Sequence, residues 1–346
     1  MLDSPIILFC SERSGSNLIS KIFDAHPEIC APGASHLFKV MSECACKFPV
    51  GSAGLREAVV DLFYAKISHW SLDDLPRSEV VSMFEGFERA DQMIAALYDA
   101  ETKMSKKRSA FIKEHSAFRY LHMLFGQSVS PRILFMVRDP RDMALSWKQG
   151  PAMRGGVLRA TDRWVYDQAG YLEALPPIMA RMPVGFLRYE DLLISPEAEC
   201  TRVCGELQIP FDPAMIEFQT HSKSAKANAK RSAMWSNIDK PLIADNSQKF
   251  LKGLSNDEIA YVEAVAGPLM KTFGYEPVRK GQAPFGSCET LDELRAKLAQ
   301  SEPHEKPAYQ TLPSEERARL EAWSSLYKRM SSLTPVPVEK LRTANQ

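Results

Sequence analysis

Continuous apolar runs alternate along the chain with amphipathic stretches. The first run, 6–10, is followed by a polar loop and then by helix-like spacing over 17–25. The same order returns at 109–113, 132–137 and 184–188. A short apolar run without polar alternation indicates a strand that is buried on both faces, as in parallel sheets. Four strand–loop–helix units in sequence therefore predict an α/β fold, with a parallel β-sheet flanked by helices.

Helical spacing also fills the segments between and after these units. It covers 54–105 and 159–181. Farther on, Ser255 is followed three residues later by Glu258, which is the sequence pattern of a capping box. We expect a helix from there to about residue 273, where the next residue is a helix-ending glycine.

The character of the chain changes after residue 280. Prolines and glycines become frequent and leave room for two short helices, near 290–299 and 314–331. The sequence therefore predicts a catalytic α/β domain over 1–280 and a helical, proline-containing extension over 281–346. We interpret the extension as an appendage to the catalytic core.

Composition limits the kinds of partner. The 346 residues include 43 Lys and Arg against 43 Asp and Glu, so the formal net charge is zero. A general nucleic-acid binder or a polybasic membrane binder would carry excess positive charge. Any phosphate-binding function must therefore come from a local pocket.

Cysteine usage and hydropathy favour a cytoplasmic protein. The seven cysteines are an odd number at scattered positions, which is typical of a reducing compartment. The pairs at 44/46 and 200/204 lack the partners of a zinc site, so we expect no metal. We find no N-terminal targeting pattern, and no apolar run reaches the ~18 residues of a membrane span.

The loop after the first apolar run has the chemistry of an anion site. It reads Ser11-Glu12-Arg13-Ser14-Gly15-Ser16-Asn17. Small residues let the backbone close around an anion, and the following helix start offers unpaired N–H groups. Arg13 adds a fixed charge with a planar fork of donors, and Ser14 and Ser16 add hydroxyls. The Lys-Ser/Thr pair of a Walker A loop is absent. The alternative is a tight strand–helix turn with a surface arginine.

A second candidate anion site follows the strand at 132–137. Arg138 stands at the strand end, and Ser146 comes eight residues later, about two helical turns on. The two side chains can converge on one phosphate. The alternative is an ion pair between Arg138 and Asp139, with Ser146 packed in its helix. Because α/β ligands bind at the carboxyl ends of parallel strands, two anion motifs there favour a ligand.

These motifs resemble the sulfotransferase family. The loop of Arg13 is similar to the family's 5′-phosphosulfate loop, and Arg138 with Ser146 is similar to its 3′-phosphate site. Two more signatures follow in the family's order, Tyr189-Glu190-Asp191-Leu192 and the late helix that closes at Phe273-Gly274-Tyr275. The resemblance extends roughly over residues 4 to 278.

The resemblance implies a P-loop NTPase-like α/β architecture and the donor 3′-phosphoadenosine 5′-phosphosulfate (PAPS). The family moves the donor's sulfuryl group to an acceptor hydroxyl or amine, and the scheme requires no metal. Gly15, Ser16 and Asn17 belong to the donor loop. Arg13 stands where many members carry Lys, so we assign it the contact to the bridging oxygen.

The catalytic base is a further expectation from the resemblance. One branch of the family places a Glu where this chain has Ala34. The other branch uses Lys-x-His, which is present as Lys113-Glu114-His115. We expect His115 as the base and Lys113 beside the sulfuryl oxygens, with His36 as the alternative base. Glu114 should point to the opposite face of its strand.

Other assignments are less specific. Arg231, in a basic segment, is a candidate third phosphate contact, and we expect Trp147 and Trp235 to pack in the core. The helices of 54–105 and the extension would shape the site for a small-molecule or glycan acceptor. The sequence does not define the oligomeric state. Two other functions stay open: an ATP- and Mg²⁺-dependent phosphotransferase, and a non-catalytic nucleotide-sulfate binding protein.

Overall fold

A parallel β-sheet forms the centre of the molecule. The computed structural model describes residues 3–126, 130–151, 153–229, 235, 239–243, 245–302 and 307–337. In these residues the sheet has five strands in the order β2-β3-β1-β4-β5. The strands are β1 (Asp3–Phe9), β2 (Ile29–Cys30), β3 (Ser109–Lys113), β4 (Arg132–Val137) and β5 (Val184–Arg188). All pairs are parallel, so the expected α/β class is confirmed.

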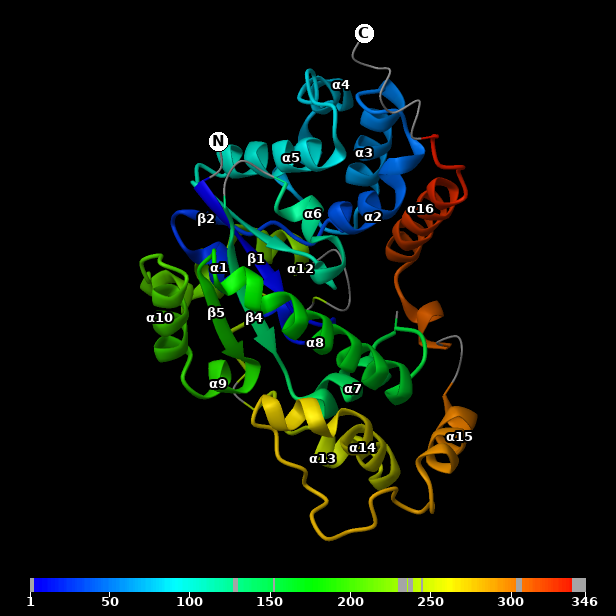
Figure 1. Ribbon diagram of the computed structural model, residues 1–346. Helices are drawn as coiled ribbons and strands as arrows, with labels where there is room; N and C mark the ends of the chain where they lie inside the picture. The colour runs from blue at the N-terminus through cyan, green and yellow to red at the C-terminus, as the bar shows by residue number, and fades with distance from the viewer. Residues whose placement is uncertain are drawn as a thin grey trace.

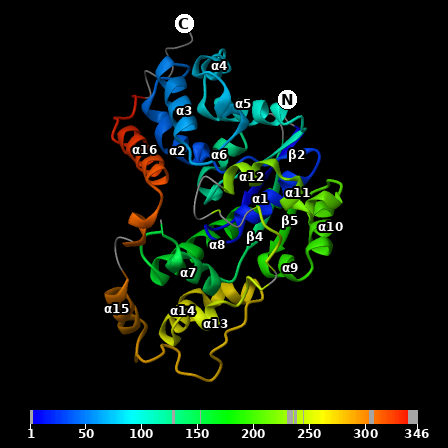
Figure 2. The ribbon, with the colours of Figure 1, turned by 180° about the vertical axis from the view of Figure 1, so that it is seen from behind.

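Alternation along the strands divides the apolar residues between two cores. In β1, Ile7 and Phe9 join one core, and Ile6 and Leu8 join the other. Because successive side chains of a strand point to opposite faces, a continuous apolar run supplies both layers. The sheet is therefore sandwiched between helices, as Figures 1 and 2 show from opposite sides.

The helices fall into three groups along the chain. α1 (Ser16–Ala25) packs with the later helices α10–α12 against one sheet face. Those after β2 are α2 (Leu37–Cys44), α3 (Ala53–Ala65), α4 (Arg77–Ser82), α5 (Ala90–Met104) and α6 (Leu121–Leu124). Those after β4 and β5 are α7 (Pro140–Gln149), α8 (Val157–Met179), α9 (Tyr189–Ile194), α10 (Pro196–Glu206), α11 (Phe218–His221), α12 (Lys223–Ala229), α13 (Phe250–Gly253) and α14 (Asn256–Thr272). Short 3₁₀ turns are η1 (Ala45–Lys47), η2 (Ser71–Asp74), η3 (Ala117–Tyr120), η4 (Pro213–Met215) and η6 (Pro307–Thr311).

Strand order places a ligand crevice beside β1. From β1 the chain leads to β2 and β3 on one side of it, and from β4, its neighbour on the other side, the chain leads away to β5. The connections therefore separate at the carboxyl end of β1, which is where open α/β sheets bind ligands. Both predicted anion motifs begin at this edge, one after β1 and one after β4.

The C-terminal extension returns across the molecule. Its helices are α15 (Leu291–Ser301), beside α14 and α8, and α16 (Ser314–Ser331), beside α2 and α3. Figures 1 and 2 show α16 running alongside the helices that precede β3, far from α15. The two helices lie close to their predicted ranges. The division into parts at residue 280 stays a prediction.

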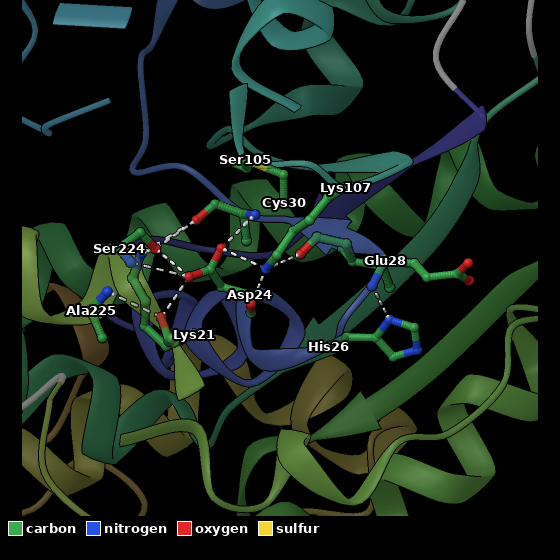
Figure 3. Close-up of polar contacts among 12 residues, drawn as sticks. Lys21, Asp24, His26, Glu28, Cys30, Ser105, Lys107, Ser224 and Ala225 are labelled. Atoms are coloured by element: carbon green, nitrogen blue, oxygen red, sulfur yellow. Dashed lines mark hydrogen bonds and ion pairs between the residues drawn. The ribbon is translucent and has the colours of Figure 1, made fainter. Parts of the chain in front are cut away.

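A buried ionic cluster ties α1 to β2 and α12 (Figure 3). Asp24 accepts hydrogen bonds from Ala31 N at 3.0 Å and from Ser222 Oγ at 2.6 Å, and Lys107 Nζ lies 3.6 Å from it. Burial alone would raise the pKa of Asp24, but the charges of Lys21 and Lys107 lower it. The carboxylate therefore stabilises the fold above its ordinary pKa, and this stability is lost as the pH falls through the lowered value.

We expect Asp24→Asn to lower the free energy of unfolding by about 3–5 kcal/mol, because it leaves Lys21 buried without its counter-charge. Urea unfolding at pH 7 measures the change. The matched control is Asp99→Asn, which breaks a partly exposed surface pair with Lys103 and should cost at most about 0.5 kcal/mol. Equal effects of the two substitutions would contradict the assignment.

Candidate active site

Both predicted anion motifs open onto one cavity of about 1090 Å³. The loop after β1 contributes Arg13, Gly15, Ser16 and Asn17 to its lining. The segment after β4 contributes Arg138 and Ser146. The structure thus brings together residues that lie more than a hundred positions apart.

The two motifs touch each other directly. Arg13 Nε donates a hydrogen bond to Ser146 Oγ at 3.1 Å, and Arg138 Nη1 donates to Arg13 O at 3.1 Å. Ser146 therefore faces the cavity and is not packed inside its helix. Ser14 differs from its neighbours in the loop, because it is fully buried and does not line the cavity.

Loop geometry requires glycine at position 15. Gly15 has φ 90° in the left-handed region, directly before the first turn of α1. A Cβ there would lie 2.4 Å from the ring of Tyr189. The Arg138 guanidinium stacks on the same ring, 4.4 Å from its centroid. Tyr189 is therefore packed between the two motifs, a role that sequence reasoning missed.

Asp139 does not form the alternative ion pair with Arg138; it pairs with Arg141 instead. Asp139 pairs with Arg141 at 2.7 Å, and Arg141 also pairs with Glu263 at 2.6 Å. Asp142 accepts hydrogen bonds from the backbone of Gln248 and Phe250. These contacts hold the wall of the cavity, while the Arg138 guanidinium donates to the backbone oxygens of Arg13 and Asn246.

The cavity concentrates positive charge around the end of β1. In the described part of the chain, Arg13, Lys113 and Arg138 have no carboxylate within ion-pair distance. Burial lowers the pKa of Arg13, and the nearby charge of Arg138 lowers it further. Burial also lowers the pKa of Lys113 to about 8, while its Nζ donates to Asn17 Oδ1. Three positive side chains held close together repel one another, and a bound polyanion would offset that repulsion.

His115 has the setting of a general base. Its Nδ1 lies 3.4 Å from Glu12 Oε1, and both ring nitrogens are buried without a geometrically defined hydrogen bond among the described residues. Burial lowers the pKa of His115 to about 4, so the ring is neutral at pH 7. Burial would raise the pKa of Glu12, but the hydrogen bond and charge of His115 lower it overall. Glu12 is therefore the carboxylate that faces the ring, a role that sequence reasoning missed.

His36 lies beside His115 in the same cavity. The two ring centroids are 5.3 Å apart. Glu114 does not line the cavity, as the strand alternation predicts, but its Oε2 lies 3.7 Å from His36 Nδ1. Ser35 Oγ donates to the same carboxylate at 3.1 Å. Glu114 thus lies outside the cavity but contacts His36, the alternative base, from behind.

Other predicted residues have mixed outcomes. Trp147 is buried as expected, yet it also lines the cavity, and so does the partly buried Trp235. The expected core position is confirmed for Trp147, and it is wrong for Trp235, which is only partly buried. Arg231 lies outside the described residues, so its proposed phosphate contact stays a prediction.

Within the described ranges, no three His, Cys, Asp or Glu side chains are grouped as metal ligands would be. No described helix has the length and apolar character needed to cross a membrane.

Fold and site together define an α/β protein with a cavity at the end of β1 that Arg13, Lys113 and Arg138 line. The family model described as the sulfotransferase family matches residues 5–213. The chain therefore belongs to the sulfotransferase family, and the expected resemblance is confirmed. Among curated protein sequences no match is found.

A solved structure supports this fold. The chain is similar to the sulfotransferase domain of the Synechococcus PCC 7002 olefin synthase, with 18% identity and a TM-score of 0.53. The match covers 79% of this chain and 96% of that domain. A sulfotransferase domain from the curacin biosynthetic pathway also matches, with 17% identity, a TM-score of 0.45, and coverage of 86% of this chain and 98% of that one.

Proposed function

We propose that this sulfotransferase moves the sulfuryl group of PAPS to an acceptor hydroxyl, or to an amine. The observation that carries the proposal is the convergence of Arg13, Lys113 and Arg138 on one cavity. Donor binding would place the 5′-phosphosulfate at the loop of Arg13 and the 3′-phosphate at Arg138 and Ser146. Backbone N–H groups at the start of α1 add donors for the 5′-phosphate.

Sulfuryl transfer needs charge stabilisation and one proton transfer. The bond between sulfur and the bridging oxygen of the 5′-phosphate breaks, and a bond from sulfur to the acceptor oxygen forms. Negative charge develops on the departing phosphate, where Arg13 lies, and Lys113 stabilises the sulfuryl oxygens. His115 Nε2 takes the proton of the acceptor hydroxyl, while the Nδ1–H group donates a hydrogen bond to the Glu12 carboxylate. The products are 3′-phosphoadenosine 5′-phosphate (PAP) and the sulfated acceptor.

The pH dependence of kcat/KM for PAPS should follow His115 and Lys113. Below about pH 4 His115 is protonated and cannot accept a proton, and above about pH 8 Lys113 loses its charge. We therefore expect a plateau from about pH 5 to 7 with a fall on each side. Initial rates with ³⁵S-labelled PAPS measure the profile, with circular dichroism showing that the protein stays folded.

Lys113→Met should remove the alkaline fall, because that variant has no amine to titrate. An alkaline fall that persists unchanged in Lys113→Met would contradict the assignment.

The direct test is transfer of ³⁵S from PAPS to an acceptor panel, run beside γ-³²P-ATP with Mg²⁺. The proposal expects sulfur label in the acceptors and no phosphorus label. Transfer from ATP alone would favour a phosphotransferase, and PAPS binding without any transfer would favour a non-catalytic binding protein. The P-loop NTPase-like architecture and the cytoplasmic location also stay predictions.

A further inference from the structure

The C-terminal helix α16 contributes to the cavity. Leu320, Trp323, Tyr327 and Met330 follow helical spacing and so share one face. Met330 is buried in the main core, and Tyr327 Oη donates a hydrogen bond to Glu43. Leu320 and Trp323, which precede Tyr327 by about two turns and one turn of the helix, line the cavity. One apolar stripe therefore packs on α2 and α3 at its far end and faces the active site at its near end.

We call the described residues 291–302 and 307–337 the strap, because each of these two segments is anchored to the rest of the molecule. At the near end, Glu302 accepts hydrogen bonds from the backbone N–H groups of Gly156 and Leu158, at the start of α8. At the far end, Val336 N donates to Cys46 O at 2.9 Å. The first segment of the strap thus contacts the start of α8, and the second, which carries Trp323, contacts the region after α2.

Trp323 approaches the catalytic histidines. Its ring meets His36 edge-on, with centroids 6.3 Å apart, and His36 is in turn 5.3 Å from His115. The tryptophan is therefore separated from the proposed base by a single imidazole. If the hydroxyl of an acceptor lies at His115, the rest of the acceptor would lie along the rings of His36 and Trp323.

We propose that the strap forms the acceptor-side wall and that Trp323 selects acceptors whose hydroxyl is carried on an apolar, ring-sized body. A tryptophan ring offers a large flat apolar surface, and Leu320 beside it adds an aliphatic one. Both side chains are partly buried. Such an apolar surface favours an apolar partner and offers no hydrogen bonds to the polar groups of a sugar. This inference rests on the proposed function, because it takes His115 as the reference point. It makes the extension part of the active site rather than an appendage.

Calorimetry with PAP-saturated protein tests the proposal, with 2-naphthol and glucosamine as probes. We expect 2-naphthol to bind more tightly than glucosamine. Trp323→Ala should weaken 2-naphthol binding about tenfold or more, and Trp323→Phe should weaken it less, since a ring remains. The matched control is Ser325→Ala, at an exposed position of the same helix, which should leave binding unchanged.

The affinity for PAP distinguishes a failure of the selectivity proposal from a failure of the donor assignment. It should be equal in all variants, which also shows that they are folded. If Trp323→Ala binds 2-naphthol as tightly as the unmodified protein, or if glucosamine is preferred, the selectivity proposal is wrong while the donor assignment stands. If the folded, unmodified protein takes up no PAP, the donor assignment fails and this proposal fails with it.

Discussion

His115→Ala should lower kcat for sulfuryl transfer by about 10²–10⁴-fold, the usual contribution of a positioned general base. The reason is the position of His115 in the cavity lining, with Glu12 3.4 Å from Nδ1 and no described hydrogen-bond partner at Nε2. The dissociation constant for PAP should change little, because the phosphates are assigned to Arg13 and Arg138. Single-turnover rates with ³⁵S-labelled PAPS measure the loss, and calorimetry measures PAP affinity.

His36→Ala is the matched control for this prediction. His36 lies in the same cavity, at 5.3 Å from His115, but its Nδ1 faces Glu114. We expect a smaller loss of kcat than for His115→Ala. If His36→Ala removes turnover and His115→Ala does not, the proton acceptor is His36 and the mechanism above is wrong.

Arg138→Met should weaken PAP binding about tenfold to a hundredfold. A hydrogen bond to a charged group contributes roughly 1.5–3 kcal/mol, and 1.4 kcal/mol corresponds to a factor of ten. Methionine keeps an unbranched stem over the Tyr189 ring and removes the charge and the donors. Arg138→Lys should lose less affinity, since it keeps the charge but not the planar fork.

Lys252→Met controls for the loss of one positive charge, because Lys252 is an exposed cation on α13. It should leave PAP affinity unchanged. If Arg138→Met binds PAP as tightly as Lys252→Met does, Arg138 does not hold the 3′-phosphate and the second anion site is misassigned.

Local patterns predict most of the fold. Apolar runs locate β1, β3, β4 and β5, and Ser255 caps α14 with the capping box that its sequence indicates. β2 was missed, because two residues are too few to show any periodicity. Its register comes from backbone pairing with β3, a long-range contact that no local pattern contains.

The site is predictable where a single segment of the sequence contains all the residues of a motif. The loop of Arg13 and the helix of Ser146 each show an anion motif, and strand order explains why they meet. The roles of Glu12, Tyr189 and Trp323 were missed for a different reason. Each acts through a partner distant in sequence, so only the folded chain brings it to His115, Arg138 or His36.

The most direct measurement is a calorimetric titration of the folded protein with PAP. The account predicts uptake of one PAP per chain, displaced by PAPS and weakened in Arg138→Met, because one cavity joins Arg13 to Arg138 and Ser146. Folded protein that takes up no PAP, or that binds it equally well without the Arg138 guanidinium, would contradict the account.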